Sequence, residues 1–177
     1  MSRLSAKQRS QRVNTLMARQ FSESRILTPV ITYEVPGLPV MQGDLAAGRH
    51  GHLYHKAKGL PQWRHNVGWR ARKSMRVNGF AGVLFGGPIA LTLMFVLRRP
   101  VNMSKRKPTE PAIKRPDLDK LARAIGDSLT DVVYVDDSQI IEEHHYKRTA
   151  EPDEETGVII QVERVVALGD WRDEYIE

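Results

Sequence analysis

The hydrophobic residues of the chain follow strand-like patterns in five segments. Residues 89–97 form an almost continuous apolar run, which is typical of a strand in the centre of a sheet. Residues 157–166 mostly alternate between apolar and polar positions, as a half-buried strand does. Shorter strands are predicted over residues 30–35, 132–135 and 139–148. The last of these segments is also compatible with a helical turn that runs into a strand.

Two further segments repeat apolar residues at helical spacing. Apolar side chains recur every four positions from Trp63 to Met75, which predicts a helix over residues 61–77. Apolar side chains at steps of three and four positions from Leu118 to Leu129 predict a second helix. Without the short run at 132–135, the element order is β-α-β-α-β-β, which indicates an α+β fold with a mixed β-sheet packed against helices. We see no internal repeat and no second domain boundary.

Charge is distributed unevenly along the chain. Residues 1–25 hold six Lys and Arg against one acid, and residues 26–150 hold 19 against 11. Residues 151–177 reverse this balance, with two Arg against nine acids. A basic body predicts a polyanionic partner such as a nucleic acid, although a soluble protein of high isoelectric point is the simpler alternative.

The composition also indicates the domain organisation and the cellular compartment of the protein. We expect a basic N-terminal arm over residues 1–27, a folded domain over residues 28–168 and an acidic tail over residues 169–177. The chain has no cysteine, which fits a reducing cytoplasm and restricts any metal to oxygen or imidazole ligands. No run of 18 apolar residues is present, so we expect no membrane span. The N-terminal residues lack the apolar core of a signal peptide, so we expect a cytoplasmic protein.

Four carboxylates gather in two short groups. Asp117 and Asp119 stand where an extended chain is predicted to turn into the second helix, and residues two apart share one face of an extended segment. Asp136 and Asp137 follow the short run at 132–135. Adjacent strand residues point to opposite faces, so we expect one of this pair to reach a metal and the other to cap or brace.

This carboxylate pattern suits a divalent cation. Mg²⁺ prefers oxygen ligands and keeps several waters, so two or three carboxylates suffice to hold it. Such an ion activates a water and stabilises the leaving oxygen in phosphodiester hydrolysis. We therefore predict a Mg²⁺ site, with Mn²⁺ as a possible substitute. The alternative interpretation is a capped helix followed by an acidic turn.

The same segment resembles the RusA-type Holliday junction resolvases, endonucleases of phages, prophages and bacteria. The shared pattern is Asp-Leu-Asp opening a helix, a basic residue four positions later, Asp-Ser-Leu and Asp-Asp-Ser-Gln. In this chain the pattern occupies residues 117–119, 123, 127–129 and 136–139. Outside this segment the resemblance is looser and consists of an early strand, a basic helix and a strand before the motif.

The resemblance implies roles for individual residues. Asp117, Asp119 and Asp137 match the metal-binding carboxylates of the family, and Arg123 stands where a catalytically important lysine is common. Arginine cannot give up its proton, so we assign Arg123 to stabilising the charge of a phosphate. Lys120 is a candidate for part of the missing lysine's role. The resemblance also implies a homodimer that makes paired cuts in a four-way DNA junction, because a two-fold junction needs two equivalent cuts.

Basic side chains on the loops and on the first predicted helix are candidates for contacts to DNA phosphates. They are Arg49, Lys56, Lys58, Arg64, Arg70, Lys73, Lys105, Arg106, Lys107, Lys114, Arg115 and Lys120. The alternative is that these cations only form a solvated surface.

Three classes of function are therefore open. The leading one is a Mg²⁺-dependent endodeoxyribonuclease that resolves four-way junctions. The second is a non-catalytic phage protein that binds branched DNA and whose acids only cap and brace. The third is a metal-dependent enzyme acting on nucleotides or sugars, and the absence of a Gly-rich phosphate loop counts against it.

Overall fold

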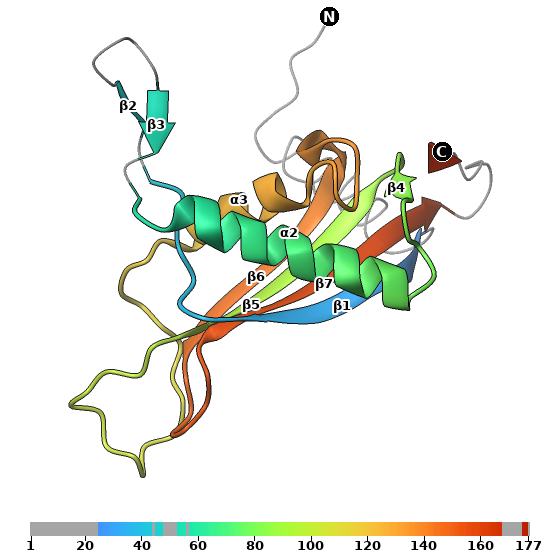
Figure 1. Ribbon diagram of the computed structural model, residues 1–177. Coiled ribbons are helices and arrows are strands. Elements are labelled where there is room, and N and C mark those ends of the chain that lie inside the picture. Colours follow the sequence, from blue (N-terminus) through green and yellow to red (C-terminus); the bar gives the residue numbers. More distant parts are fainter. Residues whose placement is uncertain (1–24, 44, 48–52, 56, 168–174, 177) are drawn as a thin grey trace, which may run out of the picture.

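The computed structural model describes residues 25–43, 45–47, 53–55, 57–167 and 175–176 of the chain. Its centre is a four-stranded mixed sheet in the order β1-β7-β5-β6 (Figure 1). The strands are β1 (Arg25–Pro36), β5 (Ile89–Leu97), β6 (Ile140–Thr149) and β7 (Gly157–Ala167). β5 and β6 run parallel, whereas β7 is antiparallel to both of its neighbours. This is the α+β architecture that the element order predicts.

Two helices cover one face of the sheet. They are α2 (Leu60–Val77) and α3 (Leu118–Leu129), which pack against each other, α2 also lying on β1 and α3 on β6. The side chains of Leu91, Leu93 and Phe95 on β5 are fully buried against them, as are Val67 of α2 and Leu121 of α3. The apolar stripe of each helix thus meets the apolar face of the sheet, which accounts for most of the core. Among the described residues neither helix is long and apolar enough to cross a membrane.

Four short strands complete the described part of the chain, and the sequence does not predict them. β2 (Leu45–Ala47) and β3 (Leu53–His55) pair antiparallel between β1 and α2, where no element was predicted. β4 (Leu84–Phe85) pairs with β8 (Tyr175–Ile176) near the C-terminal end. Strands of two or three residues are too short to show a period of two, so the pattern of hydrophobic residues does not reveal them.

The predicted strand at residues 132–135 is wrong. Asp131 adopts a positive φ of 59°, and the amides of Val132 and Val133 donate to the carbonyl of Leu129, so a turn closes α3. Val133 and Tyr134 are fully buried in the core. The apolar run therefore reflects burial of a turn, and it does not form a strand.

The boundaries of two predicted strands also differ from those observed. β1 begins at Arg25, so residues 25–27, which we assigned to the N-terminal arm, belong to the sheet. A 3₁₀ turn, η1 (Asp137–Gln139), runs directly into β6, as one interpretation of residues 139–148 allows. The rest of the predicted arm lies outside the described residues.

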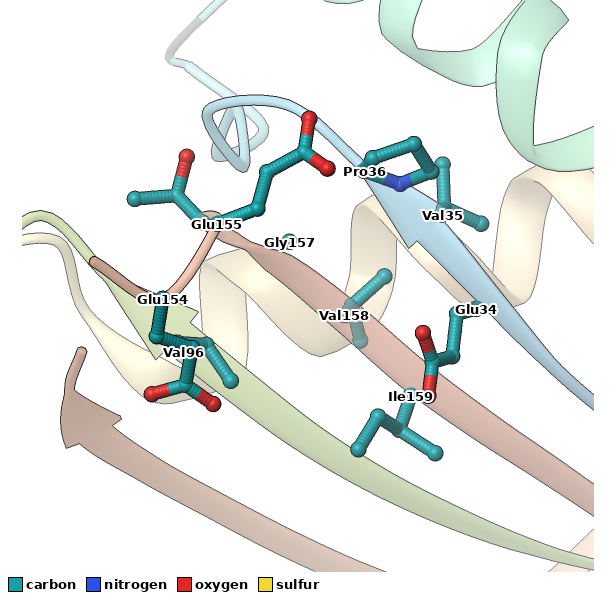
Figure 2. A pocket seen from close by; sticks show the side chains of 10 residues that line it. Glu34, Val35, Pro36, Val96, Glu154, Glu155, Gly157, Val158 and Ile159 are labelled. Carbon is teal, nitrogen blue, oxygen red and sulfur yellow. The ribbon is translucent and has the colours of Figure 1, made fainter. Parts of the chain in front are cut away.

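A small acidic pocket lies where β5 ends and β7 begins. It encloses about 180 Å³, and Figure 2 shows the carboxylates of Glu34, Glu154 and Glu155 around it. Val96, near the end of β5, also lines it. In the parallel pair β5–β6 the segment that carries Asp136 and Asp137 enters β6 at the opposite end of the strands from this acidic pocket.

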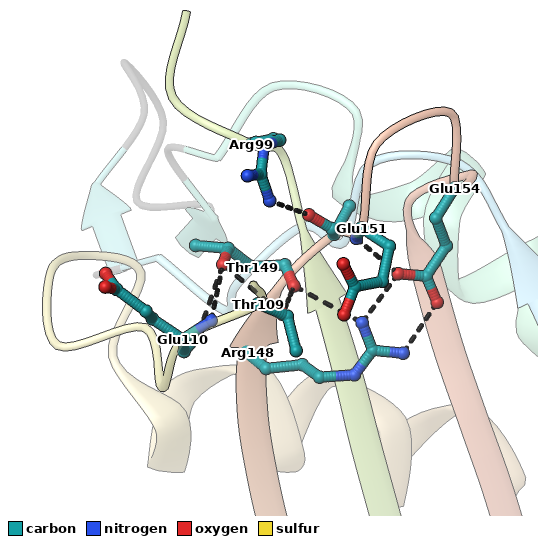
Figure 3. A network of polar contacts seen from close by, with 8 residues as sticks. Arg99, Thr109, Glu110, Arg148, Thr149, Glu151 and Glu154 are labelled. Atoms are coloured by element: carbon teal, nitrogen blue, oxygen red, sulfur yellow. Dashed lines mark hydrogen bonds and ion pairs between the residues drawn. The ribbon is translucent and has the colours of Figure 1, made fainter. Parts of the chain in front are cut away.

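An ion pair closes the turn beside this acidic pocket. The Arg148 guanidinium donates to both carboxylate oxygens of Glu154 at 2.6 Å each, and the Glu151 amide donates to the same carboxylate at 2.7 Å (Figure 3). Nearby, Arg99 donates to the carbonyl of Ala150 at 3.1 Å. Paired, fork-like hydrogen bonds of this kind combine charge with fixed geometry.

This ion pair predicts a pH-dependent contribution to stability. The hydrogen bonds from Arg148 are the main cause that lowers the pKa of Glu154 to about 2. A carboxyl whose pKa is lower in the folded than in the unfolded state stabilises the fold above its unfolded pKa of 4.5 and loses this effect as the pH falls toward 2. We expect Glu154→Gln to reduce the free energy of unfolding by about 1 kcal/mol at pH 7.

Urea unfolding at pH 7, 5 and 3 checks this expectation. The difference between wild type and Glu154→Gln should persist from pH 7 to pH 5 and shrink at pH 3. Glu155→Gln, at the neighbouring exposed carboxylate, is the matched control and should show no such trend. A difference for Glu154→Gln that is the same at pH 7 and pH 3 would contradict the assignment.

Candidate active site

The first group of carboxylates lies at the start of α3. Asp117 occupies the N-cap position with extended backbone (φ −73°, ψ 135°), but its side chain makes no capping hydrogen bond. Asp119 lies in the first helical turn, and both side chains are exposed. The extended approach that we predicted for this segment is confirmed.

The two carboxylates of the second group have different surroundings. Asp136 caps a turn, and Asp137 lines the pocket described below. Asp136 caps η1, accepting from the Ser138 amide at 2.9 Å, while the Gln139 side chain accepts from the Asp136 amide at 2.9 Å. These hydrogen bonds from Ser138 lower the pKa of the Asp136 carboxyl. The Gln139 amide group also donates to the carbonyls of Phe85 (2.9 Å) and Gly87. The expectation that one member of the pair caps is therefore confirmed, and that member is Asp136.

A β-bulge at the start of β6 sets which side chains face α3. Ile140 pairs with Ile89 and Glu142 with the next residue of β5, so Ile141 is an extra residue in the ladder. Beyond the bulge, Glu143 and His145 lie on the same side of the sheet as Ile140, toward the helices. Bulges commonly reorient side chains beside active sites in this way. The bulge cannot be predicted from the sequence, so the sequence does not assign Glu143 and His145 to the site.

These elements enclose a pocket of about 390 Å³. Its lining comes from α3, η1 and β6 and consists of Asp119, Ala122, Arg123, Gly126, Asp137, Ile140, Glu143 and His145. The structure thus brings together Asp119, Arg123 and Asp137, three of the four predicted catalytic residues. Asp117 is not part of the lining. Among the described residues no group of three or more Asp, Glu or His side chains is already arranged around one point as a metal cluster.

The pocket concentrates negative charge above a buried phenol. Tyr134 is fully buried, and its hydroxyl donates to the Gly126 carbonyl at 2.9 Å. Burial raises the pKa of Tyr134 most strongly, and the charges of Asp137 and Glu143 raise it further. Tyr134 therefore stays neutral and holds the backbone at Gly126, which lines the pocket. A cation entering this pocket would relieve the repulsion between the carboxylates.

His145 is the imidazole of the pocket. Its Nε2 atom is buried, makes no hydrogen bond and lies 3.6 Å from a carboxylate oxygen of Glu143. Burial lowers the pKa of His145, and the neighbouring Glu143 opposes this effect. The neutral ring can accept a hydrogen bond from a molecule that enters the pocket.

A lysine anchors the chain that leads into the site. Lys147 follows Glu143 and His145 on the same side of β6, and its ammonium donates to the carbonyls of Pro116 (2.8 Å) and Lys114 (2.9 Å). These bonds hold the segment just before Asp117 against the sheet. The exposed cations of that loop are thereby kept near the pocket.

The predicted DNA-binding cations have different surroundings. Arg64 forms an ion pair with Asp127 and donates to the Gln42 side chain at 3.1 Å, so it links α2 to α3 within the fold. Lys107 pairs with Glu110 at 2.5 Å. The exposed ones are Lys58, Lys73, Lys105, Arg106, Lys107, Lys114 and Arg115, while Arg70 and Lys120 are partly buried. Arg49 and Lys56 lie outside the described residues.

Comparison with known proteins bears on this site directly. A family model described as "Endodeoxyribonuclease RusA" matches residues 36–163, which is most of the chain and includes every residue of the pocket. A search of curated proteins gave no match.

Proposed function

The chain belongs to the RusA family of endodeoxyribonucleases, which cleave Holliday junctions during DNA recombination, and we propose that its pocket uses Mg²⁺ to do so. The observation that carries this proposal is the pocket itself. Two carboxylates from segments separated in sequence, Asp119 and Asp137, line it together with the cationic Arg123.

The residues of the pocket fit a hard divalent cation. Asp119 and Asp137 supply oxygen ligands, and Glu143 adds a third carboxylate to the lining. Mg²⁺ is commonly held by one or two carboxylates with waters and substrate phosphate filling the other positions, so a preformed cluster of three is not required. We propose Asp119 and Asp137 as ligands and Asp117, exposed at the N-cap, as the third. When bound, the ion activates water and offsets charge on the leaving oxygen.

Arg123 acts on the substrate rather than on a proton. Its guanidinium stays protonated across the whole working range of pH and presents several donors to a phosphate. It lies one turn after Asp119 on α3, so both side chains line the same pocket. We propose that Arg123 holds the scissile phosphate beside the carboxylates and stabilises the charge that develops on it.

The substrate class suggests a symmetric assembly. A four-way junction with two-fold symmetry needs two equivalent incisions, and a two-fold homodimer provides two equivalent pockets. We propose that two copies of the chain act on branched DNA in the cytoplasm, each hydrolysing one strand. Mn²⁺ is proposed as a substitute for Mg²⁺.

A cleavage assay on three substrates tests the proposed function. Equal amounts of a four-way junction, a three-way fork and a linear duplex are incubated with the protein and Mg²⁺, with EDTA as the metal-free control. We expect paired cuts in the junction, little cutting of the linear duplex and no cutting in EDTA. Equal cutting of all three substrates would contradict the junction specificity. Binding without any cutting would instead support a non-catalytic DNA-binding protein.

A further inference from the structure

Helix α2 exposes an indole ring among positive charges. Trp69 is 54% exposed, and the Lys73 ammonium lies 5.8 Å from the centroid of its ring. Arg72, Lys73 and Arg76 are exposed on the following turns. The 18 residues of α2 contain five Arg and Lys and no Asp or Glu. This stripe from Trp69 to Arg76 is called the α2 surface below.

The Trp69 side chain is not part of the hydrophobic core. The side of α2 that faces the sheet buries Trp63, Val67, Ala71 and Met75. Trp69 comes six residues after Trp63 and six before Met75, so its side chain lies about 120° around the helix from each of them. An exposed aromatic ring among cations is the combination that surfaces binding single-stranded nucleic acid use.

The charges and the aromatic ring of the α2 surface indicate which class of partner binds there. Cations without neighbouring acids on the helix fit a polyanion, and an aromatic ring among them fits the face of a base. A second copy of the chain is a poor occupant, because a two-fold contact would place Arg72, Lys73 and Arg76 against the same residues of the partner. An acidic protein would satisfy the charges but would give the exposed ring no specific partner.

The α2 surface also belongs to the same helical layer as the proposed active site. α2 and α3 pack closely, since a Cβ added to Gly68 would lie only 3.3 Å from the Ser128 carbonyl oxygen. The Arg64–Asp127 ion pair joins the two helices as well. α2 therefore lies directly beside α3, the helix that carries Asp119 and Arg123.

We propose that Trp69 stacks on an unpaired base of branched DNA while Lys73 and Arg76 contact the adjoining phosphates. This inference rests on the proposed function, which supplies the branched DNA, and adds a means of recognising it. Bases are unpaired only where strands separate, so a stacking residue distinguishes a branch point from a continuous duplex. Contacts to phosphates make no such distinction.

The test compares Trp69→Ala with Arg76→Ala on two DNAs in Ca²⁺, which is used to limit cleavage. One DNA is a four-way junction with two unpaired thymines at its centre, and the other is a linear duplex of equal length. Trp69→Ala should weaken junction binding by about 5- to 100-fold and leave both duplex binding and the salt dependence unchanged. Arg76→Ala should weaken binding to both DNAs and reduce the slope of log K against log salt by about one.

A conservative variant and tryptophan fluorescence provide two further measurements. Trp69→Phe retains an aromatic face and should recover most of the lost affinity, and oligo(dT) should quench tryptophan emission in wild type more than in Trp69→Phe. Equal losses on both DNAs, or no loss on either, would overturn the stacking role. A wild-type protein that fails to bind or cut any junction would instead contradict the proposed function. Trp69 is exposed, so thermal melting of Trp69→Ala should match wild type.

Discussion

The Asp119→Asn protein is expected to cleave a four-way junction in Mg²⁺ at least about 100-fold more slowly than wild type, while binding it with similar affinity. Asparagine keeps the size of the side chain and removes its charge. The pocket would then retain Asp137 and Glu143 but lose the carboxylate contributed by α3. Because Asp119 is exposed and contributes nothing to the core, its replacement should leave the fold intact.

The acidic pair of η1 provides a matched control for this experiment. Asp137→Asn should resemble Asp119→Asn, since both remove a carboxylate from the pocket. Asp136→Asn should stay within a few-fold of wild type, because asparagine is as good a cap as aspartate and the Asp136 side chain is committed to the Ser138 amide. Full activity of Asp119→Asn, or equal inactivation by Asp136→Asn, would contradict the assignment of ligands.

Replacing Arg123 with glutamine is expected to lower the cleavage rate by about 10²- to 10³-fold, with a much smaller loss of junction affinity. A glutamine at this position can still donate a hydrogen bond but carries no charge. The loss should therefore fall mainly on the chemical step, in which charge grows on the phosphate. Single-turnover rates and binding measured separately in Ca²⁺ distinguish the two effects.

The lysine variant separates charge from proton transfer. If Arg123 only supplies charge, Arg123→Lys should recover part of the activity, and its rate should depend on pH as in wild type. Arg98→Gln, at an exposed cation that is not among the predicted DNA contacts, is the control for a general loss of positive charge and should change the cleavage rate little. An ionisation that is present in the pH–rate profile of wild type and missing from that of Arg123→Gln would contradict our view that this residue moves no proton.

Much of the fold follows from local patterns. The strand at residues 89–97 and the helix at residues 118–129 were predicted with their observed bounds, because each carries a long and regular apolar pattern. The strand predicted at 132–135 is wrong, because burial of a turn selects the same apolar residues as a strand does. Its interpretation depends on tertiary contacts that hydrophobicity alone does not encode.

The residues of the candidate site were likewise predicted only in part. Asp119, Arg123 and Asp137 were predicted, and the structure brings them to one pocket because η1 returns the chain to the side of α3. Glu143 and His145 reach that pocket only through a one-residue bulge in β6. A bulge reverses the alternation of all residues after it, so no pattern that counts residues could assign these two side chains. The metal ligands themselves remain a prediction.

The most direct measurement is an anomalous difference map from crystals of the protein soaked in Mn²⁺. We predict a peak inside the pocket, in contact with carboxylate oxygens of both Asp119 and Asp137, and no such peak in crystals of Asp119→Asn treated in the same way. A soaked crystal whose Mn²⁺ peaks all lie away from this pocket would contradict the central claim.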